Sequence, residues 1–248
     1  MKERGRNENM IPKIIHFCWF GRGKMPEKAE ACIASWKRFC PDYEIIEWNE
    51  DTFDINSNVY VKEAYENRKF AFVTDYVRLY AMYNYGGIYM DTDVEVLKPL
   101  DEFLDNIAFS GFESSQYIPT GIMASEKGFP LYKEFLDYYE ERHFVKPDGS
   151  LDMTTNVIIM TDIAKKHGLI CDGGMQTLDG WKLYPSDYFC PLNDKTGKLE
   201  TTHNTAVIHW FAKSWVSERD RRISKITKIF HKIFGEHWFD WLKKIIKR

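Results

Sequence analysis

Residues 70–101 read FAFVTDYVRLYAMYNYGGIYMDTDVEVLKPLD and contain the clearest structural signals of the chain. Its first half predicts a helix over Phe72–Tyr85, because aromatic and aliphatic side chains recur there at helical spacing. The pair Gly86-Gly87 ends that helix, and Ile88–Met90 follows as a short strand. The strand runs directly into Asp91-Thr92-Asp93. Two carboxylates are therefore expected at the carboxyl end of a strand.

The segments upstream predict that this strand belongs to a partly parallel sheet. Lys13–Trp19 (KIIHFCW) is expected to be a buried strand, Pro26–Phe39 a helix, and Tyr43–Trp48 a second strand. A strand, a helix and a strand at this spacing form a βαβ unit. Further helices are expected at Val59–Asn67, Leu131–Arg142 and Asn156–His167, and further strands at Val94–Val96 (an edge segment), Ala108–Phe112, Gly121–Ala124 and Ala206–Trp210. The chain between His167 and Ala206 is expected to be irregular.

Composition limits the classes of protein that this sequence can represent. The chain has 248 residues, of which 44% are apolar and 29% charged, so intrinsic disorder and a disulfide-stapled miniprotein are excluded. A net charge of −3 gives no support to nucleic-acid binding. Five cysteines without a CxxC pair predict reduced thiols, and neither a signal peptide nor a membrane-spanning run is visible. We expect a cytoplasmic protein.

The C-terminal segment differs electrostatically from the rest of the chain. Residues 221–248 contain nine Lys or Arg and two Asp or Glu, a local charge of +7. Apolar residues recur at helical spacing between the lysines, which predicts basic amphipathic helices. We therefore expect a main domain over residues 1–220 and a tail over 221–248. The tail is expected to dock on the inner face of the cell membrane; the alternative is a helix packed on the domain.

Two acidic residues, Asp91 and Asp93, are the strongest chemical signal. Residues two apart on an extended backbone point the same way, so both carboxylates can hold one hard cation, with Mn²⁺ or Mg²⁺ the best fit. Acidic residues at this spacing are also common on solvated loops. Asp75 and Arg78 share a helix face that leads into this strand; they could contact sugar hydroxyls, or form only a surface ion pair.

Two further segments could complete a site. His209-Trp210-Phe211-Ala212-Lys213-Ser214-Trp215 follows a late strand, where His209 could be a third metal ligand and Lys213 could pair with a diphosphate. Near the N-terminus, Trp19 follows the strand that contains Phe17 and could stack on a nucleobase. For His209 and Trp19 a place in the core is the alternative.

Together these segments resemble glycosyltransferase family thirty-two. The resemblance rests on IPKIIHFCWFG (11–21), on the stretch 70–101 and on AVIHWFAKSW (206–215). That family includes bacterial capsular polysaccharide transferases and the initiating mannosyltransferase of yeast outer chains, and the catalytic domains of clostridial glucosylating toxins show a related pattern. The resemblance implies a GT-A fold, which is an α/β fold with a Rossmann-like mixed sheet flanked by helices.

The resemblance also implies an activity and roles for individual residues. The activity is a metal-dependent retaining transfer from a nucleotide-sugar donor to a glycan or lipid-linked saccharide acceptor in capsular or surface polysaccharide synthesis. Uridine diphosphate sugars are the favoured donors, and guanosine diphosphate sugars are the alternative. By this resemblance Asp91 and Asp93, with His209, hold the metal, and Asp75 and Arg78 contact the donor sugar. The donor-binding residues are Trp19, Phe17, Lys213, Ser214 and Trp215. The alternatives are a non-catalytic nucleotide-sugar-binding protein and a metal-dependent phosphohydrolase.

Overall fold

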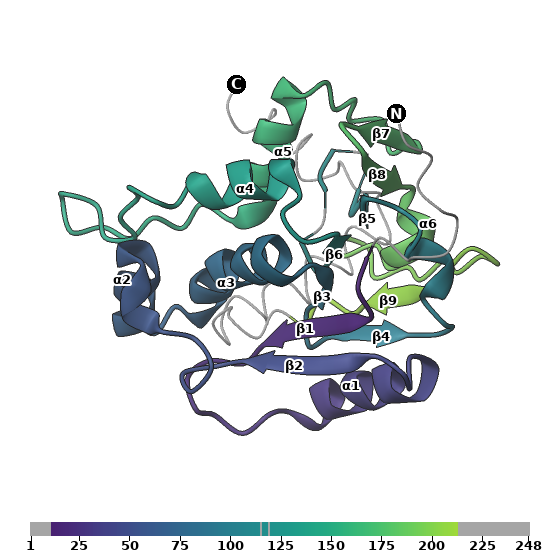
Figure 1. Cartoon of the computed structure of the whole chain (residues 1–248), viewed down its shortest axis with the longest axis horizontal. Coiled ribbons are helices and arrows are strands. Elements are labelled where there is room, and N and C mark those ends of the chain that lie inside the picture. The colour runs from purple at the N-terminus through teal and green to yellow at the C-terminus, as the bar shows by residue number, and fades with distance from the viewer. Residues whose placement is uncertain (1–10, 115, 119, 213–248) are drawn as a thin grey trace, which may run out of the picture.

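The computed structural model describes residues 11–114, 116–118 and 120–212, and within them a mixed sheet forms the centre of the molecule (Figure 1). The sheet has seven strands in the order β2-β1-β3-β6-β5-β8-β7. Their bounds are β1 Ile14–Cys18, β2 Glu44–Trp48, β3 Gly87–Met90, β5 Ala108–Gly111, β6 Ile122–Ser125, β7 Gln176–Leu178 and β8 Trp181–Tyr184. In Figure 1 this order runs upward from β2 to β7, with α3 to the left of the strands and α6 and β9 to the right.

Helices cover both faces of the sheet. They are α1 Glu27–Phe39, α2 Val59–Glu66, α3 Phe70–Tyr85, α4 Pro130–Asp137, α5 Asn156–Lys166 and α6 Ser186–Phe189, with 3₁₀ turns η1 Ile55–Ser57 and η2 Asp101–Phe103. Neighbouring strand residues enter different cores: Tyr89 packs with α2–α5, whereas Ile88 and Met90 pack with α1, η2 and α6. The alternation follows from the two-residue period of a strand. The predicted α/β fold, a mixed sheet flanked by helices, is confirmed.

The N-terminal βαβ unit forms as predicted. β1 pairs in parallel with β2, with Ile14 opposite Glu44, and also in parallel with β3, with His16 opposite Tyr89. β3 then pairs antiparallel with β6, so the sheet is mixed. Because β1 and β3 run the same way, their carboxyl ends lie side by side at one edge of the sheet.

Glycine ends α3 for a steric reason. Gly86 has a φ of +71°, and a Cβ there would lie 2.6 Å from the backbone nitrogen of Lys127. No other residue fits this turn without backbone movement, because L side chains disfavour positive φ and the neighbouring atom belongs to the main chain. The turn leads directly into β3, which ends at Met90. Asp91 is therefore the first residue beyond the carboxyl end of that strand.

A small second sheet was not predicted. β4 Val94–Val96 pairs antiparallel with β9 Val207–His209, with Val94 opposite His209. The predicted strand at Val94–Val96 therefore exists, but it belongs to this two-stranded ladder and not to the edge of the main sheet.

Two other predictions on secondary structure were wrong. The helix expected to reach Arg142 ends at Asp137, because the chain continues in single turns that bury Tyr139 against Tyr60, with ring centroids 4.9 Å apart. The region expected to be irregular contains β7, β8 and α6. Strands of three or four residues are too short to show a period in sequence.

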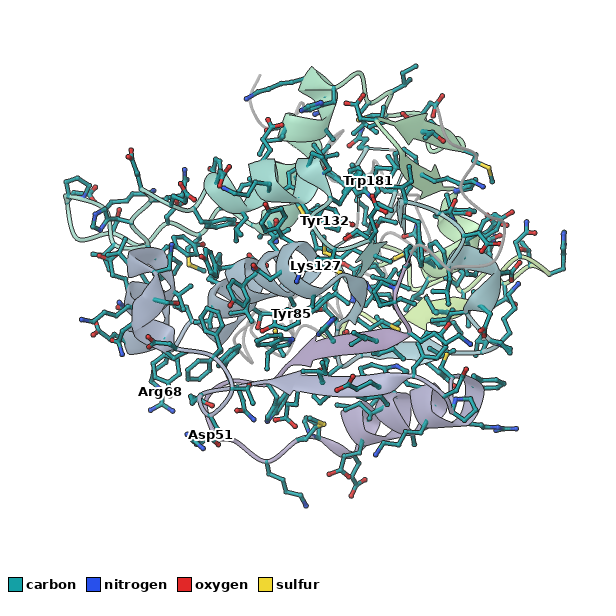
Figure 2. All side chains as sticks on the ribbon, in the orientation of Figure 1. Asp51, Arg68, Tyr85, Lys127, Tyr132 and Trp181 are labelled. Atoms are coloured by element: carbon teal, nitrogen blue, oxygen red, sulfur yellow. The ribbon has the colours of Figure 1, made fainter. Side chains whose placement is uncertain are left out.

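The strand β8 is anchored by an aromatic contact, because Trp181 of β8 packs edge-on against Tyr132 of α4. Figure 2 shows these two rings inside the molecule, whereas Asp51 and Arg68 lie at its periphery.

No helix in the described ranges combines the length and apolar character needed to cross a bilayer. The predicted tail, residues 221–248, and the boundary at residue 220 lie outside the described residues.

Candidate functional site

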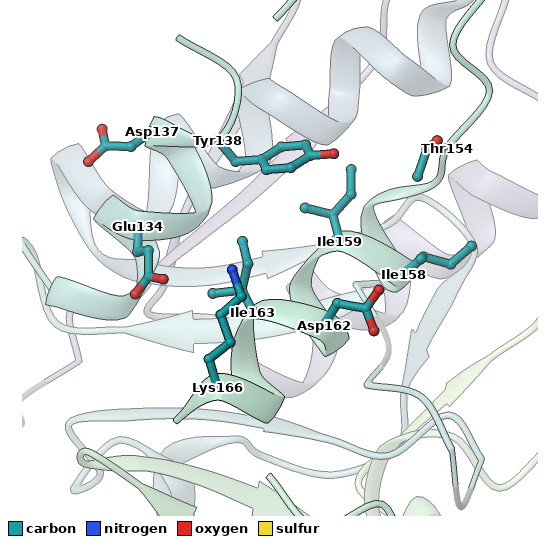
Figure 3. Close-up of a pocket in the computed structure, with 9 residues that line it drawn as sticks. All are labelled: Glu134, Asp137, Tyr138, Thr154, Ile158, Ile159, Asp162, Ile163 and Lys166. Carbon is teal, nitrogen blue, oxygen red and sulfur yellow. The ribbon is translucent and has the colours of Figure 1, made fainter. Parts of the chain in front are cut away.

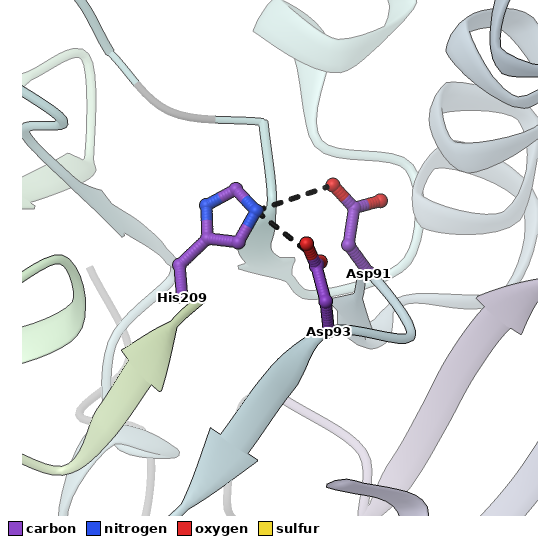
Figure 4. Close-up of side chains that lie close together, drawn as sticks. All are labelled: Asp91, Asp93 and His209. Carbon is purple, nitrogen blue, oxygen red and sulfur yellow. Dashed lines mark ion pairs between the residues drawn. The ribbon is translucent and has the colours of Figure 1, made fainter. Parts of the chain in front are cut away.

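Asp91, Asp93 and His209 converge at the carboxyl end of β3 (Figure 4). His209 Nε2 lies 3.3 Å from Asp93 Oδ1 and 4.0 Å from Asp91 Oδ2. One ligand atom from each residue lies within 4.8 Å of the others. The side chains of Asp91 and Asp93 are 26% and 16% exposed, so the group is recessed but open to solvent. The two carboxylates are therefore accessible to an ion from solvent.

The main chain sets this convergence. Asp91 N–H donates to Gly121 O at 2.8 Å, which extends the β3–β6 ladder by one residue. The turn closes when Val94 N–H donates to Asp91 O at 3.0 Å, and β4 begins there. The antiparallel pairing of β4 with β9 then brings His209 opposite Val94. His209 thus reaches the aspartates through strand register, although it lies 115 positions after Val94 in the chain.

The charges at Asp93 and His209 stabilise each other. Burial alone would raise the pKa of Asp93, but the attraction and hydrogen bond of His209, together with the Ala212 N–H, outweigh burial and lower it. Burial would likewise lower the pKa of His209, yet Asp93 raises it well above its usual value. Ala212 N–H donates to Asp93 Oδ2 at 2.6 Å. Asp93 is therefore an anion with one oxygen fixed by the backbone and the other directed at His209.

Asp75 and Arg78 form a buried pair beside this group. Their side chains are only 11% and 6% exposed, so the alternative of a solvated surface pair is wrong. Arg78 Nη1 donates to Thr120 O at 2.6 Å and lies 3.4 Å from Asp91 Oδ1, while Nη2 lies 3.4 Å from Asp75 Oδ1. Burial raises the pKa of Asp75 to about 7, against the opposing charge of Arg78. The guanidinium therefore connects the helix carboxylate to the first aspartate of the DxD motif.

Two residues of the site were missed from the sequence. Tyr89 OH donates to Asp91 Oδ1 at 2.7 Å. Asn156, the first residue of α5, donates from its backbone to Asp75 Oδ2 at 3.3 Å and from Nδ2 to Asp75 O at 3.0 Å. Tyr89 could have been found, because it is next but one to Asp91 on the strand and so points to the same side. Asn156 had no local signal, since it meets Asp75 only through packing of α5 on α3.

The predicted donor-binding residues at the end of β1 separate into two positions. Trp19 is partly exposed at the sheet edge that carries Asp91, and its Nε1 donates to Gly23 O at 2.7 Å. Phe17 is buried and packs edge-on against Trp36 of α1, with centroids 5.7 Å apart. The donor contact expected of Phe17 stays a prediction; the alternation of β1 directs its ring toward α1. Lys213, Ser214 and Trp215 lie outside the described residues.

A separate pocket of about 410 Å³ lies between α4 and α5 (Figure 3). Tyr138, Ile158 and Ile163 supply much of its apolar wall, and Glu134, Asp162 and Lys166 are at its rim. None of the predicted site residues lines it. The pocket is therefore separate from the candidate site at Asp91 and Asp93.

Sequence comparison adds an independent observation. Residues 26–110 match the glycosyltransferase sugar-binding region containing the DXD motif. The matched segment runs from the start of α1 into β5, and it includes Asp75, Arg78, Asp91 and Asp93. His209 lies beyond it. The match agrees with the glycosyltransferase resemblance, while membership of family thirty-two and the relation to toxins remain predictions.

Similar proteins with curated names include two fungal enzymes. Inositol phosphoceramide mannosyltransferase 3 of Schizosaccharomyces pombe is 32% identical over 125 residues, which cover 49% of this chain and 35% of that protein. Mannosyl phosphorylinositol ceramide synthase SUR1 of Saccharomyces cerevisiae is 26% identical, over 64% of this chain and 43% of that protein. The chain thus spans less than half the length of these relatives. A solved glycosyltransferase involved in glycosylation of the major capsid of PBCV-1 is 14% identical, with a TM-score of 0.47 over 86% of this chain and all of that one.

Proposed function

We propose that this protein is a metal-dependent glycosyltransferase that moves a sugar from a nucleoside diphosphate donor to a glycan or lipid-linked acceptor. One observation carries the proposal: Asp91, Asp93 and His209 converge beside the buried Asp75–Arg78 pair, and the segment holding four of these five residues matches a DXD glycosyltransferase family. One fungal relative is named an inositol phosphoceramide mannosyltransferase, and the other a mannosyl phosphorylinositol ceramide synthase. Those names support a lipid acceptor and make mannose a candidate for the transferred sugar. For the nucleotide of the donor, the resemblance favours uridine diphosphate.

The donor set fits a divalent cation. Two carboxylate oxygens and one imidazole nitrogen are hard to borderline ligands, so Asp91, Asp93 and His209 would hold Mn²⁺ or Mg²⁺. The imidazole favours Mn²⁺ of the two, because Mg²⁺ prefers oxygen ligands alone. When bound, the ion supplies neutralisation of the negative charge that develops on the leaving diphosphate.

The protein's own groups would bind and orient the donor. Arg78 already donates to Thr120 O and approaches both Asp75 and Asp91, so its remaining N–H groups are held in a fixed direction. A fixed guanidinium and carboxylate can hydrogen-bond neighbouring sugar hydroxyls without paying an ordering cost during the reaction. Trp19 would stack on the base, and Lys213 would pair with the diphosphate. We assign no nucleophile to the retaining reaction.

The tail is part of the proposal. Residues 221–248 would hold the enzyme on an anionic membrane surface, where a lipid-linked acceptor is present. This placement would make the protein peripheral to the inner face of the cell membrane, in the synthesis of capsular or surface polysaccharide.

The test is a screen of nucleotide-sugars with Mn²⁺, following release of nucleoside diphosphate and transfer to acceptor. We expect Asp91→Asn and Asp93→Asn each to lower turnover about 10²–10³-fold, the usual cost of removing one group that stabilises developing charge. Asp105→Asn is the matched control, because Asp105 is exposed. Normal turnover by both site variants would refute the metal role.

The same screen separates the two alternatives. A non-catalytic binding protein would be stabilised by nucleotide-sugar and Mn²⁺ but release no nucleoside diphosphate. A phosphohydrolase would release orthophosphate in place of nucleoside diphosphate. Either result would overturn the proposed transferase activity.

A further inference from the structure

Thr120 and Gly121 touch three parts of the candidate site. The carbonyl of Thr120 accepts from Arg78 Nη1 at 2.6 Å, and the carbonyl of Gly121 accepts from Asp91 N–H at 2.8 Å. The third contact involves an atom that glycine lacks. A Cβ at Gly121 would lie 2.7 Å from His209 Cε1, 2.8 Å from Nδ1 and 3.2 Å from Nε2. The three nearest heavy atoms all belong to the His209 ring.

The His209 ring has little room to move away from that point. The Phe211 ring packs against it with centroids 4.2 Å apart. Cys190 Sγ lies 3.9 Å from Nδ1, and Asp93 Oδ1 lies 3.3 Å from Nε2. The His209 side chain is 11% exposed, so these neighbours enclose most of it. A methyl group at residue 121 would have to displace the ring.

Backbone conformation does not explain this glycine. Gly86 and Gly87 have φ values of +71° and +99°, which disfavour other residues, but Gly121 lies outside that left-handed range. Its backbone could be adopted by alanine. The space that glycine leaves is therefore the property that matters at this position.

We propose that Gly121 is a positioning residue for the metal site: its missing side chain leaves the space in which the His209 ring stands with Nε2 toward Asp91 and Asp93. The inference rests on the proposed metal-binding function. It gives Gly121, which directly precedes β6, a role in metal affinity in addition to its main-chain hydrogen bond with Asp91. Gly121 touches no ligand itself; it acts through His209.

The experiment measures Mn²⁺ affinity of the full chain without donor, by titration of free Mn²⁺ in electron paramagnetic resonance. Gly121→Ala is expected to weaken Mn²⁺ binding about 10–100-fold, the usual effect of changing a residue that orients a metal ligand. Gly23→Ala is the matched control, because Gly23 also lies outside the left-handed region and a Cβ there meets nothing within 4 Å. It should bind Mn²⁺ as the unchanged protein does.

A double variant shows whether the effect passes through the imidazole. His209→Ala should weaken Mn²⁺ binding, and adding Gly121→Ala to it should cause no further loss, because the ring that the methyl group displaces is gone. If Gly121→Ala alone fails to fold, the double variant should recover a cooperative thermal transition for the same reason.

The outcomes separate this inference from the proposed function. Unchanged affinity in Gly121→Ala, with loss in His209→Ala, would overturn the role of Gly121 and leave the metal site standing. A further loss in the double variant would also overturn it, since Gly121 would then act by another route. Unchanged affinity in His209→Ala would remove His209 from the metal site, and the inference would fail with it.

Discussion

Arg78 shows how a side chain can serve the fold and the candidate site together. It is buried on α3, donates to the carbonyls of Thr74 and Thr120, and packs over the Tyr89 ring at 4.8 Å. Burial alone would lower its pKa, but Asp91, Tyr89 and Asp75 more than offset that and raise it. The guanidinium is therefore permanently charged, and the carbonyls and carboxylates around it are hydrogen-bonded to it or paired with its charge.

Removing this charge should destabilise the protein strongly. Arg78→Met keeps much of the side-chain volume but leaves Asp75 buried without its charged partner, which typically costs about 3–5 kcal/mol. Arg22→Met is the control: Arg22 is 60% exposed in its pair with Asp51, and exposed pairs contribute about 0–1 kcal/mol. Urea unfolding of both variants measures the difference. Similar losses of stability in the two variants would contradict the structural role given to Arg78.

Two sets of contacts join helices and strands that are distant in the chain. The β4–β9 ladder carries His209 to the aspartates, and Trp210 reinforces it by donating from its backbone to Asp93 O at 3.0 Å and from Nε1 to Glu95 Oε2 at 2.9 Å. Away from that ladder in sequence and in contacts, His167 at the end of α5 bridges two other elements. Its Nε2 lies 2.7 Å from Glu134 of α4, and its Nδ1 lies 3.0 Å from Asp179 in the turn between β7 and β8.

The His167 bridge should make stability depend on pH. Hydrogen bonds to Glu134 and then Asp179 raise the pKa of His167 in the folded protein above its usual value near 6.5. A group with a raised folded pKa contributes stability below the unfolded pKa and loses it as pH rises through the folded pKa. We therefore expect His167→Gln to lower the free energy of unfolding at pH 6 and to have a smaller effect at pH 9.

Urea unfolding of the protein and of His167→Gln at both pH values tests this expectation. The quantity to compare is the difference between the two proteins at each pH, because other groups titrate in both. A difference that grows toward pH 9 would show that the imidazole is not a charged bridge.

At the scale of the whole molecule, the charge is divided between a main domain and a basic tail. Residues 221–248 carry +7, whereas the whole chain carries −3. Each Lys or Arg near an anionic leaflet contributes about 1 kcal/mol of binding. A protein ending at residue 220 is therefore expected to be released from vesicles containing phosphatidylserine, while the full chain sediments with them.

Two controls make the truncation informative. Vesicles of neutral lipid should retain little of either form, and Mn²⁺ affinity of the shortened protein should match that of the full chain. Equal sedimentation of both forms with anionic vesicles would contradict the proposed membrane role of the tail.

The features predicted correctly from sequence are those that depend on residues close together in the chain. Helical spacing before Gly86-Gly87 predicted α3, and strand–helix–strand spacing predicted the parallel pair of β1 and β2. Two carboxylates directly after a strand predicted the group at Asp91 and Asp93. Such patterns are readable because side-chain direction in a helix or strand repeats over a few residues.

Contacts between residues far apart in the chain became visible only in the folded structure. Strand register placed His209 against Asp93, helix packing buried Arg78 and added Asn156, and the face of β1 sent Phe17 into the core. The space at Gly121 likewise has meaning only once the His209 ring stands beside it. Register and packing are set by contacts between residues far apart in sequence, so no local pattern contains them.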